Sequence, residues 1–193
     1  LPENMYAFEP NERLYFRLKR IFTNINIYPF ALSDKNETAT FKIPIIKGKE
    51  FNSRGTLKVD YRENGEEKHV FQQVKVIKLD DWEELKNLKK IDFIKIDVEG
   101  NEMQTLRGAK NMIEKFRPTL MVEMEQRHHQ EPLYQLISEI ENWGYQPYFL
   151  NRKTFELENL GENLIANLSQ NFIDSKETYI NNIIFIPKNH KTQ

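Results

Sequence analysis

The sequence predicts an α/β protein organised around one parallel β-α-β unit. Residues 91–98 form a short, mostly apolar run, which is typical of a strand buried on both faces. Apolar residues recur at helical spacing over 103–116, and they predict one helix behind that strand. Residues 119–124 form a second apolar run. This order indicates two neighbouring parallel strands joined by a helix.

Acidic residues stand where both predicted strands end. Ligands of open α/β sheets bind beyond the carboxyl ends of the strands, so Asp97, Glu99 and Glu123 are candidate functional residues. Asp97 could accept a proton from a hydroxyl group, or it could simply form an ion pair with Lys95. Glu99 could bind substrate, or it could stabilise the N-terminus of the following helix, which favours anions.

A pair of histidines, His128 and His129, follows the second strand. A histidine can act as a general base near neutral pH, which makes His128 a further candidate. Together with Asp97 and the nearby glutamates, the pair could also bind a divalent cation. Adjacent histidines do not easily face one site, so we expect no metal.

The N-terminal part of the chain has the pattern strand, helix, strand. Residues 5–9 predict a strand that ends at Glu9, Pro10 opens a helix, and residues 25–32 predict one further strand that ends at Ser33. An acidic side chain in the position of Glu9 can accept both ribose hydroxyls of a nucleotide-like cofactor. It could equally be an exposed glutamate beside a helix start.

Residues 35–78 break this α/β pattern. The segments 38–45, 56–61 and 70–79 are rich in β-branched and aromatic residues, and they predict antiparallel strands. Asn64-Gly65 is a hairpin signal within this segment. We therefore expect an antiparallel insertion beside the main sheet.

The remaining elements are shorter. Residues 80–88 predict a helix capped by one of its first two aspartates. Residues 133–143 predict an amphipathic helix, and residues 145–150 and 180–186 predict two strands that close the sheet as an antiparallel pair. The stretch 151–175 is polar and has no clear periodicity.

Composition narrows the classes of protein. The 193 residues are enough for one domain with its own core. A net charge of -1 gives no electrostatic reason to expect nucleic acid or an anionic membrane as the main partner. No apolar run is long enough to span a bilayer. The absence of cysteine favours a reducing compartment, so we expect a cytoplasmic protein.

Several blocks of the sequence together resemble the FkbM family of S-adenosylmethionine-dependent methyltransferases. The most specific block is Asp-Phe-Ile-Lys-Ile-Asp-Val-Glu-Gly-Asn-Glu at 92–102, with Leu-Arg-Gly-Ala at 106–109 downstream. Tyr-Ala-Phe-Glu-Pro-Asn at 6–11 and Ala-Leu-Ser-Asp at 31–34 precede it. Their order and spacing match the family over most of the chain.

The resemblance implies a Rossmann-like class I methyltransferase sheet, mostly parallel, with an antiparallel C-terminal strand pair and a β-hairpin insertion at 35–78. It implies S-adenosylmethionine as cofactor and O-methylation of a hydroxyl on a sugar, a glycan or another small natural product. By this resemblance Asp97 and Glu99 face the reaction centre, Asp97 also contacts the cofactor, and Glu123 and His128 shape or activate the acceptor site. The other implied cofactor contacts are Glu9 for the ribose and Ala31, Leu32, Ser33 and Asp34 for the adenine.

The chain departs from the family pattern in its glycines. The first of its seven glycines is Gly48, and no two lie close enough to form a glycine-rich cofactor loop. Because the chain also begins at Leu1, we expect the first strand and that loop to precede it in a longer protein. Unpaired strand edges would then favour homo-oligomers. The alternative is a degenerate module that has lost catalysis and serves protein interaction.

Overall fold

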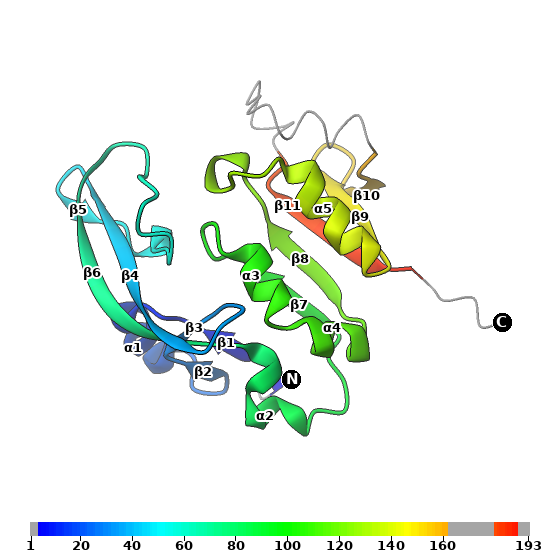
Figure 1. Cartoon of the computed structure of the whole chain (residues 1–193), viewed down its shortest axis with the longest axis horizontal. Coiled ribbons are helices and arrows are strands. Elements are labelled where there is room, and N and C mark those ends of the chain that lie inside the picture. Colours follow the sequence, from blue (N-terminus) through cyan, green and yellow to red (C-terminus); the bar gives the residue numbers. More distant parts are fainter. Residues whose placement is uncertain (1–3, 162–179, 189–193) are drawn as a thin grey trace. The chain divides into compact units, whose positions relative to one another are not determined.

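The computed structural model describes residues 4–161 and 180–188 of the chain. The described helices and strands form an α/β protein with three sheets (Figure 1). Within these residues no helix has both the length and the apolar character needed to cross a membrane.

The chain divides into two compact units, which are described separately. The first comprises Leu1–Asn87 and Gln104–Lys110, and the second comprises Leu88–Met103 and Asn111–Gln193. The expectation of one domain stays a prediction.

The first unit begins with the predicted strand, helix and strand. β1 (Tyr6–Phe8) pairs in parallel with β2 (Asn26–Tyr28), and α1 (Glu12–Ile21) connects them. The side chain of Asn11 caps α1 by accepting a hydrogen bond of 3.1 Å from the N–H of Leu14. The local signals in this part of the sequence are therefore sufficient to place β1 and α1.

The single strand predicted over 25–32 is wrong. The structure has two short strands, β2 and β3 (Phe30–Leu32), and they belong to different sheets. Pro29 lies between them, and a proline has no N–H to donate to a strand ladder. β3 pairs in parallel with β6 (Glu66–Ile77) instead.

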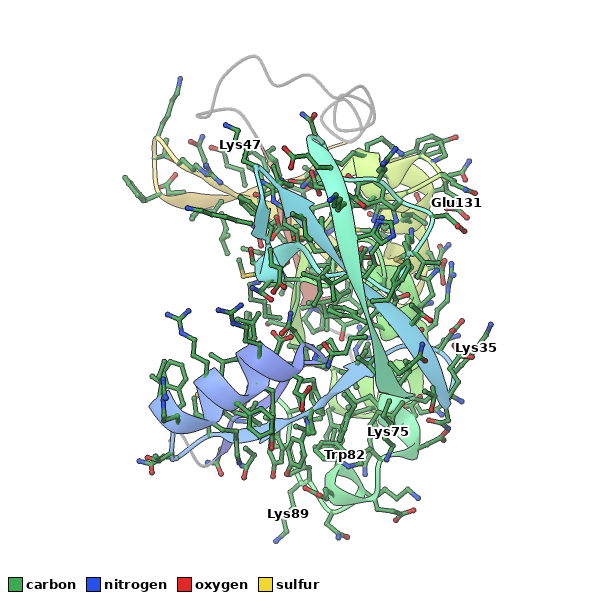
Figure 2. All side chains as sticks on the ribbon, turned by 90° about the vertical axis from the view of Figure 1, so that its left-hand side faces the viewer. Lys35, Lys47, Lys75, Trp82, Lys89 and Glu131 are labelled. Carbon is green, nitrogen blue, oxygen red and sulfur yellow. The ribbon has the colours of Figure 1, made fainter. Side chains whose placement is uncertain are left out.

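An aromatic cluster packs β1, β2 and β3 around Trp82, which is labelled in Figure 2. The ring centroid of Trp82 lies 4.5 Å from that of Tyr28 and 5.1 Å from that of Phe8, both with edge-to-face geometry. Phe30 joins the cluster at 5.8 Å. Because Phe8 precedes Glu9 and Phe30 precedes Ala31, the cluster fixes the strand ends that carry these candidate residues.

The β-rich segment forms most of a four-stranded sheet with the order β3-β6-β4-β5. β4 (Glu37–Ile46) and β6 pair in antiparallel register, as predicted. β5 (Lys49–Glu50) pairs antiparallel with the end of β4. The strand predicted over 56–61 is wrong, because only Thr56 makes a bridge there, to Lys42. The core of this sheet contains Ala31, Phe41, Ile43, Val74 and Val76.

Three short helical turns complete the first unit. η2 (Asn52–Arg54) lies in the loop before β6, and η3 (Leu79–Asp81) leads into α2 (Glu83–Lys86). The predicted aspartate cap is wrong: Trp82 occupies the N-cap position of α2, and no side chain makes a capping hydrogen bond there.

The predicted β-α-β unit is present. β7 (Phe93–Ile96) pairs in parallel with β8 (Thr119–Glu123) in the second unit. The single helix predicted between them is wrong, because the chain forms α3 (Glu102–Arg107) and α4 (Lys110–Phe116) instead. Gly108 lies at the break.

The break at Gly108 follows from a close approach of two backbones within the first unit. A Cβ atom added to Gly108 would lie 1.9 Å from the carbonyl oxygen of Ser33. The carbonyl of Gly108 accepts a hydrogen bond of 2.9 Å from the N–H of Asp80. Nearby, the hydroxyl of Thr105 donates to the carbonyl of Leu32 at 2.9 Å. The Leu-Arg-Gly-Ala block thus packs directly on the end of β3.

The sheet of the second unit has the order β10-β9-β11-β8-β7. The expectation of a mostly parallel sheet is wrong, because only β7 and β8 pair in parallel. β11 (Asn182–Pro187) lies between β8 and β9 (Tyr145–Asn151) and is antiparallel to both, which confirms the predicted antiparallel closing pair. A short turn adds β10 (Glu156–Asn159), which the sequence did not predict, to the edge of β9.

α5 (Leu133–Asn142) packs on β9 and ends before Gly144, as predicted. Gly144 has φ +84°, a conformation that favours glycine. The guanidinium of Arg117 donates to the carbonyls of Trp143 and Gly144 at 2.5 and 2.6 Å and lies over the ring of Tyr145. Side chains that are almost fully buried in this unit include Leu120, Val122, Ile137, Ile140, Ile183 and Phe185.

Candidate functional site

A pocket lined by acidic side chains lies in the second unit, at the carboxyl ends of β7 and β8. It is a small pocket that is partly open to solvent. Five carboxylates and one imidazole line it: Asp97, Glu99, Glu102, Glu123, Glu125 and His128. The structure therefore brings together all four residues that the sequence predicted to be catalytic.

Strand register explains why Asp97 and Glu123 meet. Ile96 of β7 pairs with Val122 of β8, so Asp97 and Glu123 each follow a paired residue and extend on the same side. Burial raises the pKa of Glu123, and the negative charge of Asp97 raises it further. A hydrogen bond between the two carboxyl groups acts in the same direction. Glu123 therefore keeps its proton to a higher pH than an isolated glutamate would.

The side chain of Asn181, which directly precedes β11, partly offsets this rise in the pKa of Glu123. The side-chain N–H of Asn181 donates to Oε1 of Glu123 at 2.7 Å and acts to lower the pKa of Glu123. The backbone carbonyl of Asn181 also accepts a hydrogen bond of 2.7 Å from Met124. The sequence did not identify Asn181 as a site residue, because its contact to Glu123 depends on β11 pairing with β8.

The ion pair between Lys95 and Asp97 is present, with Nζ and Oδ2 2.7 Å apart. It does not neutralise a buried charge, because the two side chains are 46% and 40% exposed. Exposed ion pairs of this kind contribute little to stability. The ion pair with Lys95 is therefore not enough to explain why an aspartate stands at this position.

The turn after β7 places Glu99 at the pocket. Glu99 has φ +51° and Gly100 has φ +102°, and the positive value is uncommon for a residue other than glycine. Glu102, rather than Glu99, accepts the hydrogen bonds of this turn: its Oε1 receives the N–H of Gly100 at 2.9 Å and of Val98 at 3.3 Å. The carboxylate of Glu99 also lines the pocket.

The two histidines have different partners. Nε2 of His129 lies 3.2 Å from Oε2 of Glu102, and the two side chains are only 4% and 3% exposed. Burial acts to raise the pKa of Glu102, but the contacts with His129 and the Gly100 N–H outweigh it and lower that pKa. His129 thus faces the buried carboxylate of Glu102, and of the two histidines only His128 lines the pocket.

His128 faces two carboxylates across the pocket. Its Nε2 lies 3.5 Å from Oε2 of Glu99 and 3.7 Å from Oε2 of Glu125. Burial lowers the pKa of His128, and the charge of Arg127 adds to this, although the surrounding acidic groups oppose it. The imidazole therefore favours its neutral form at pH 7, in which one ring nitrogen can accept a proton.

Gln126 holds the loop that carries both histidines. Its Oε1 accepts the N–H of Leu133 at 3.0 Å, and its Nε2 donates to the carbonyls of His129 and Glu131 at 3.1 and 3.0 Å. These bonds tie η4 (Gln126–His128) to the start of α5. The sequence did not predict this role, because glutamine in a polar loop has no distinctive pattern.

The residues implied for cofactor binding lie in the first unit, apart from Asp97. Glu9 follows β1, and its Oε1 accepts the N–H of Asn11 at 2.8 Å. Among the described residues, Oε2 of Glu9 has no hydrogen-bond partner. Burial raises the pKa of Glu9, and the bond from Asn11 partly opposes this. A half-buried carboxylate with one oxygen available is suited to accept a hydroxyl group.

The segment implied for adenine is partly used by the fold. Ala31 and Ser33 are buried, and the N–H of Ser33 donates to the carbonyl of Ile77 at 3.0 Å. Leu32 and Asp34 are half-buried. Their contact with adenine stays a prediction.

Comparison with known proteins identifies a family model that matches this chain and a solved structure with a similar fold. The family model described as "Methyltransferase FkbM domain" matches residues 2–147. The crystal structure of Methyltransferase FkbM from Methylobacillus flagellatus KT at 2.20 Å resolution is similar in fold, with a TM-score of 0.51 and 15% sequence identity. The match covers 95% of this chain and 36% of that chain. No curated protein matches this chain significantly in sequence.

Proposed function

Because this chain belongs to the FkbM methyltransferase family, we propose that it transfers a methyl group from S-adenosylmethionine to a hydroxyl group. The observation that carries this proposal is the carboxyl pair of Asp97 and Glu123 at the ends of two parallel strands. Hydroxyl methylation needs a proton acceptor beside the reacting oxygen, and this pair offers one with a raised pKa.

The residues of the first unit suit part of the cofactor. The available oxygen of Glu9 is suited to a ribose hydroxyl, and the end of β3 at Ser33 lies in the same unit. No glycine-rich loop is present among the 193 residues to contact the methionine part of the cofactor. The fit therefore concerns the nucleoside part.

The reaction requires few groups from the protein. When bound, S-adenosylmethionine supplies a sulfonium methyl group that is open to attack. The acceptor oxygen forms the new bond to the methyl carbon as the bond between carbon and sulfur breaks, and the hydroxyl proton passes to a carboxylate. Alignment of the acceptor contributes most to such a displacement, and a positioned base typically adds about 10²- to 10⁴-fold.

Glu123 is the proposed base. Its raised pKa brings the carboxylate closer to the pH at which proton transfer is most effective. The charge of Asp97 favours the proton that Glu123 takes up, or Asp97 contacts the amino-acid end of the cofactor. Neutral His128 accepts a hydrogen bond from the acceptor. Glu99 adds a further acceptor on the opposite wall.

The pocket also suggests the class of acceptor. Glu102 is already used by the turn and by His129, and the other four carboxylates of the pocket can accept hydrogen bonds. An acceptor with several hydroxyl groups, such as a sugar or a glycan, can donate to several of them at once. This chemistry supports a carbohydrate acceptor over an apolar one.

The test combines cofactor binding with methyl transfer. We expect calorimetric binding of S-adenosylhomocysteine, and transfer of labelled methyl groups to a panel of sugars. Glu123→Gln should keep the binding and lower transfer by about 100-fold or more, whereas the exposed control Glu156→Gln should change neither. Absence of both binding and transfer would instead support the degenerate interaction module.

A further inference from the structure

α1 has an outer surface that the fold of the first unit does not use. None of its residues is fully buried. Phe16 is 61% exposed, Ile21 is 55% exposed, and the C-cap residue Phe22 is 45% exposed. Burial of the exposed Phe16 ring against another surface would be favourable.

Cations surround this exposed ring. Phe16 lies three or four positions from Arg13, Lys19 and Arg20, and residues at this spacing are neighbours on a helix surface. Arg17 adds a fourth exposed cation, and Glu12 is the only acidic residue of α1. Side chains ending in nitrogen project from α1 in Figure 2.

Most of these cations have no partner within the part of the chain that the structure describes. Arg13 lies 3.5 Å from Glu50, in a pair whose side chains are largely exposed. Arg17, Lys19 and Arg20 form no ion pair with any described residue. The outer surface of α1 thus presents three unpaired positive charges beside an aromatic ring.

We propose that α1 binds to an anionic lipid surface. Phe16 inserts at the level of the headgroups, and the basic side chains contact their phosphates. Helices that lie on membranes combine exposed aromatic or aliphatic residues with lysine and arginine in this way. The unpaired positive charges of Arg17, Lys19 and Arg20 complement the negative charge of such a surface.

The expected attraction to anionic lipids comes from the cations on α1 and not from the net charge of the chain. The net charge of the chain is -1, which gave no reason to expect an anionic membrane as a partner. Salt screens charges beyond about 10 Å at 0.1 M, so the cluster on α1 acts largely independently of distant acidic residues. The inference does not depend on the proposed methyl transfer.

Vesicle sedimentation with the 193-residue chain tests this proposal. We expect binding to vesicles of phosphatidylglycerol and phosphatidylcholine in equal parts, no binding to phosphatidylcholine alone, and loss of binding in high salt. Each basic residue near such a surface contributes about a five-fold gain in affinity. The triple variant Arg17→Gln, Lys19→Gln, Arg20→Gln should therefore bind about 100-fold more weakly. Phe16→Ser should also bind several-fold more weakly.

A matched control separates position from total charge. Lys35→Gln, Lys68→Gln and Lys89→Gln remove three exposed cations elsewhere and should leave binding within a few-fold of the unchanged chain. Equal weakening by the two triple variants would overturn the proposal, and so would equal binding to both kinds of vesicle. Self-association that Phe16→Ser abolishes, without vesicle binding, would overturn it in favour of a second copy of the chain. Circular dichroism establishes that each variant is folded.

Discussion

Replacement of Gly108 by alanine gives the sharpest test of the packing in the first unit. The added Cβ would lie 1.9 Å from the carbonyl oxygen of Ser33 and 2.7 Å from its carbonyl carbon. Ordinary contacts between carbon atoms are about 3.5–4.0 Å. Both atoms belong to the backbone of Ser33, directly after β3, so rotation of a side chain cannot relieve the overlap.

The backbone around Ser33 is also held in place. The N–H of Ser33 donates to Ile77 on β6, and Thr105 donates to the carbonyl of Leu32. Overpacking of this kind costs about 1–3 kcal/mol, and the depth of the overlap places Gly108→Ala near the upper value. For a chain of this size, about 3 kcal/mol corresponds to a fall in Tm of roughly 6–12 °C.

Urea unfolding of Gly108→Ala, followed by circular dichroism, measures this cost. Gly161→Ala is the matched control, because no heavy atom of the described residues lies within 4 Å of a Cβ at that position. We expect the control to change stability by less than about 1 kcal/mol, in the stabilising direction. A Gly108→Ala variant within about 0.5 kcal/mol of the unchanged chain would refute the close approach of Gly108 to Ser33.

Three further predictions concern the acidic pocket. The pKa of Glu123 is raised in the folded chain. Its contribution to stability is therefore present below the pKa of a glutamate in the unfolded chain, about 4.3, and is lost as the pH rises through the folded value. Glu123→Gln should be more stable than the unchanged chain at pH 7 but not at pH 4, and urea midpoints that differ equally at both pH values would contradict this. The lowered pKa of Glu102 has the opposite sign, so its stabilisation is present above the unfolded pKa and is lost as the pH falls through the folded value. Glu102→Gln should cost about 1–3 kcal/mol at pH 7, and an unchanged urea midpoint would show that the contact with His129 contributes nothing. Glu99→Asn should weaken methyl transfer but preserve stability within about 0.5 kcal/mol, because asparagine tolerates a positive φ. Glu99→Val should lower the free energy of unfolding by more than about 1 kcal/mol. Equal unfolding midpoints for the two variants would argue against the left-handed turn.

Local signals in the sequence were enough to predict the elements that build the site. The apolar runs at β7 and β8 identified two parallel strands, and their ends identified Asp97 and Glu123. Once two parallel strands are neighbours, their carboxyl ends lie at the same edge of the sheet, so the meeting of these carboxylates needs no further information. The same reasoning placed Glu9 at the end of β1.

Contacts between distant segments account for the features that the sequence did not predict. The helix break at Gly108 reflects its contact with Ser33 and Asp80, whereas the periodicity of 103–116 continues through it. The predicted strand over 25–32 is divided because Phe30 pairs with Lys75 on β6. Pro29 was a local sign of that division, but the partner of each segment depends on contacts that the local pattern does not show.

β11 carries no proposed catalytic residue, but it affects the pKa of Glu123 in the pocket. Asp97 and Glu123 would form the same carboxyl pair on β7 and β8 alone. β11 then brings Asn181 to Glu123, and the donated hydrogen bond lowers a pKa that burial and Asp97 raise. Because an amide donor stabilises the charged form of a carboxylate, the antiparallel insertion of β11 adjusts the strength of the proposed base. Removal of this donor, as in Asn181→Ala, should therefore raise the pKa that governs methyl transfer; an unchanged pH profile would show that Asn181 only supports the strand.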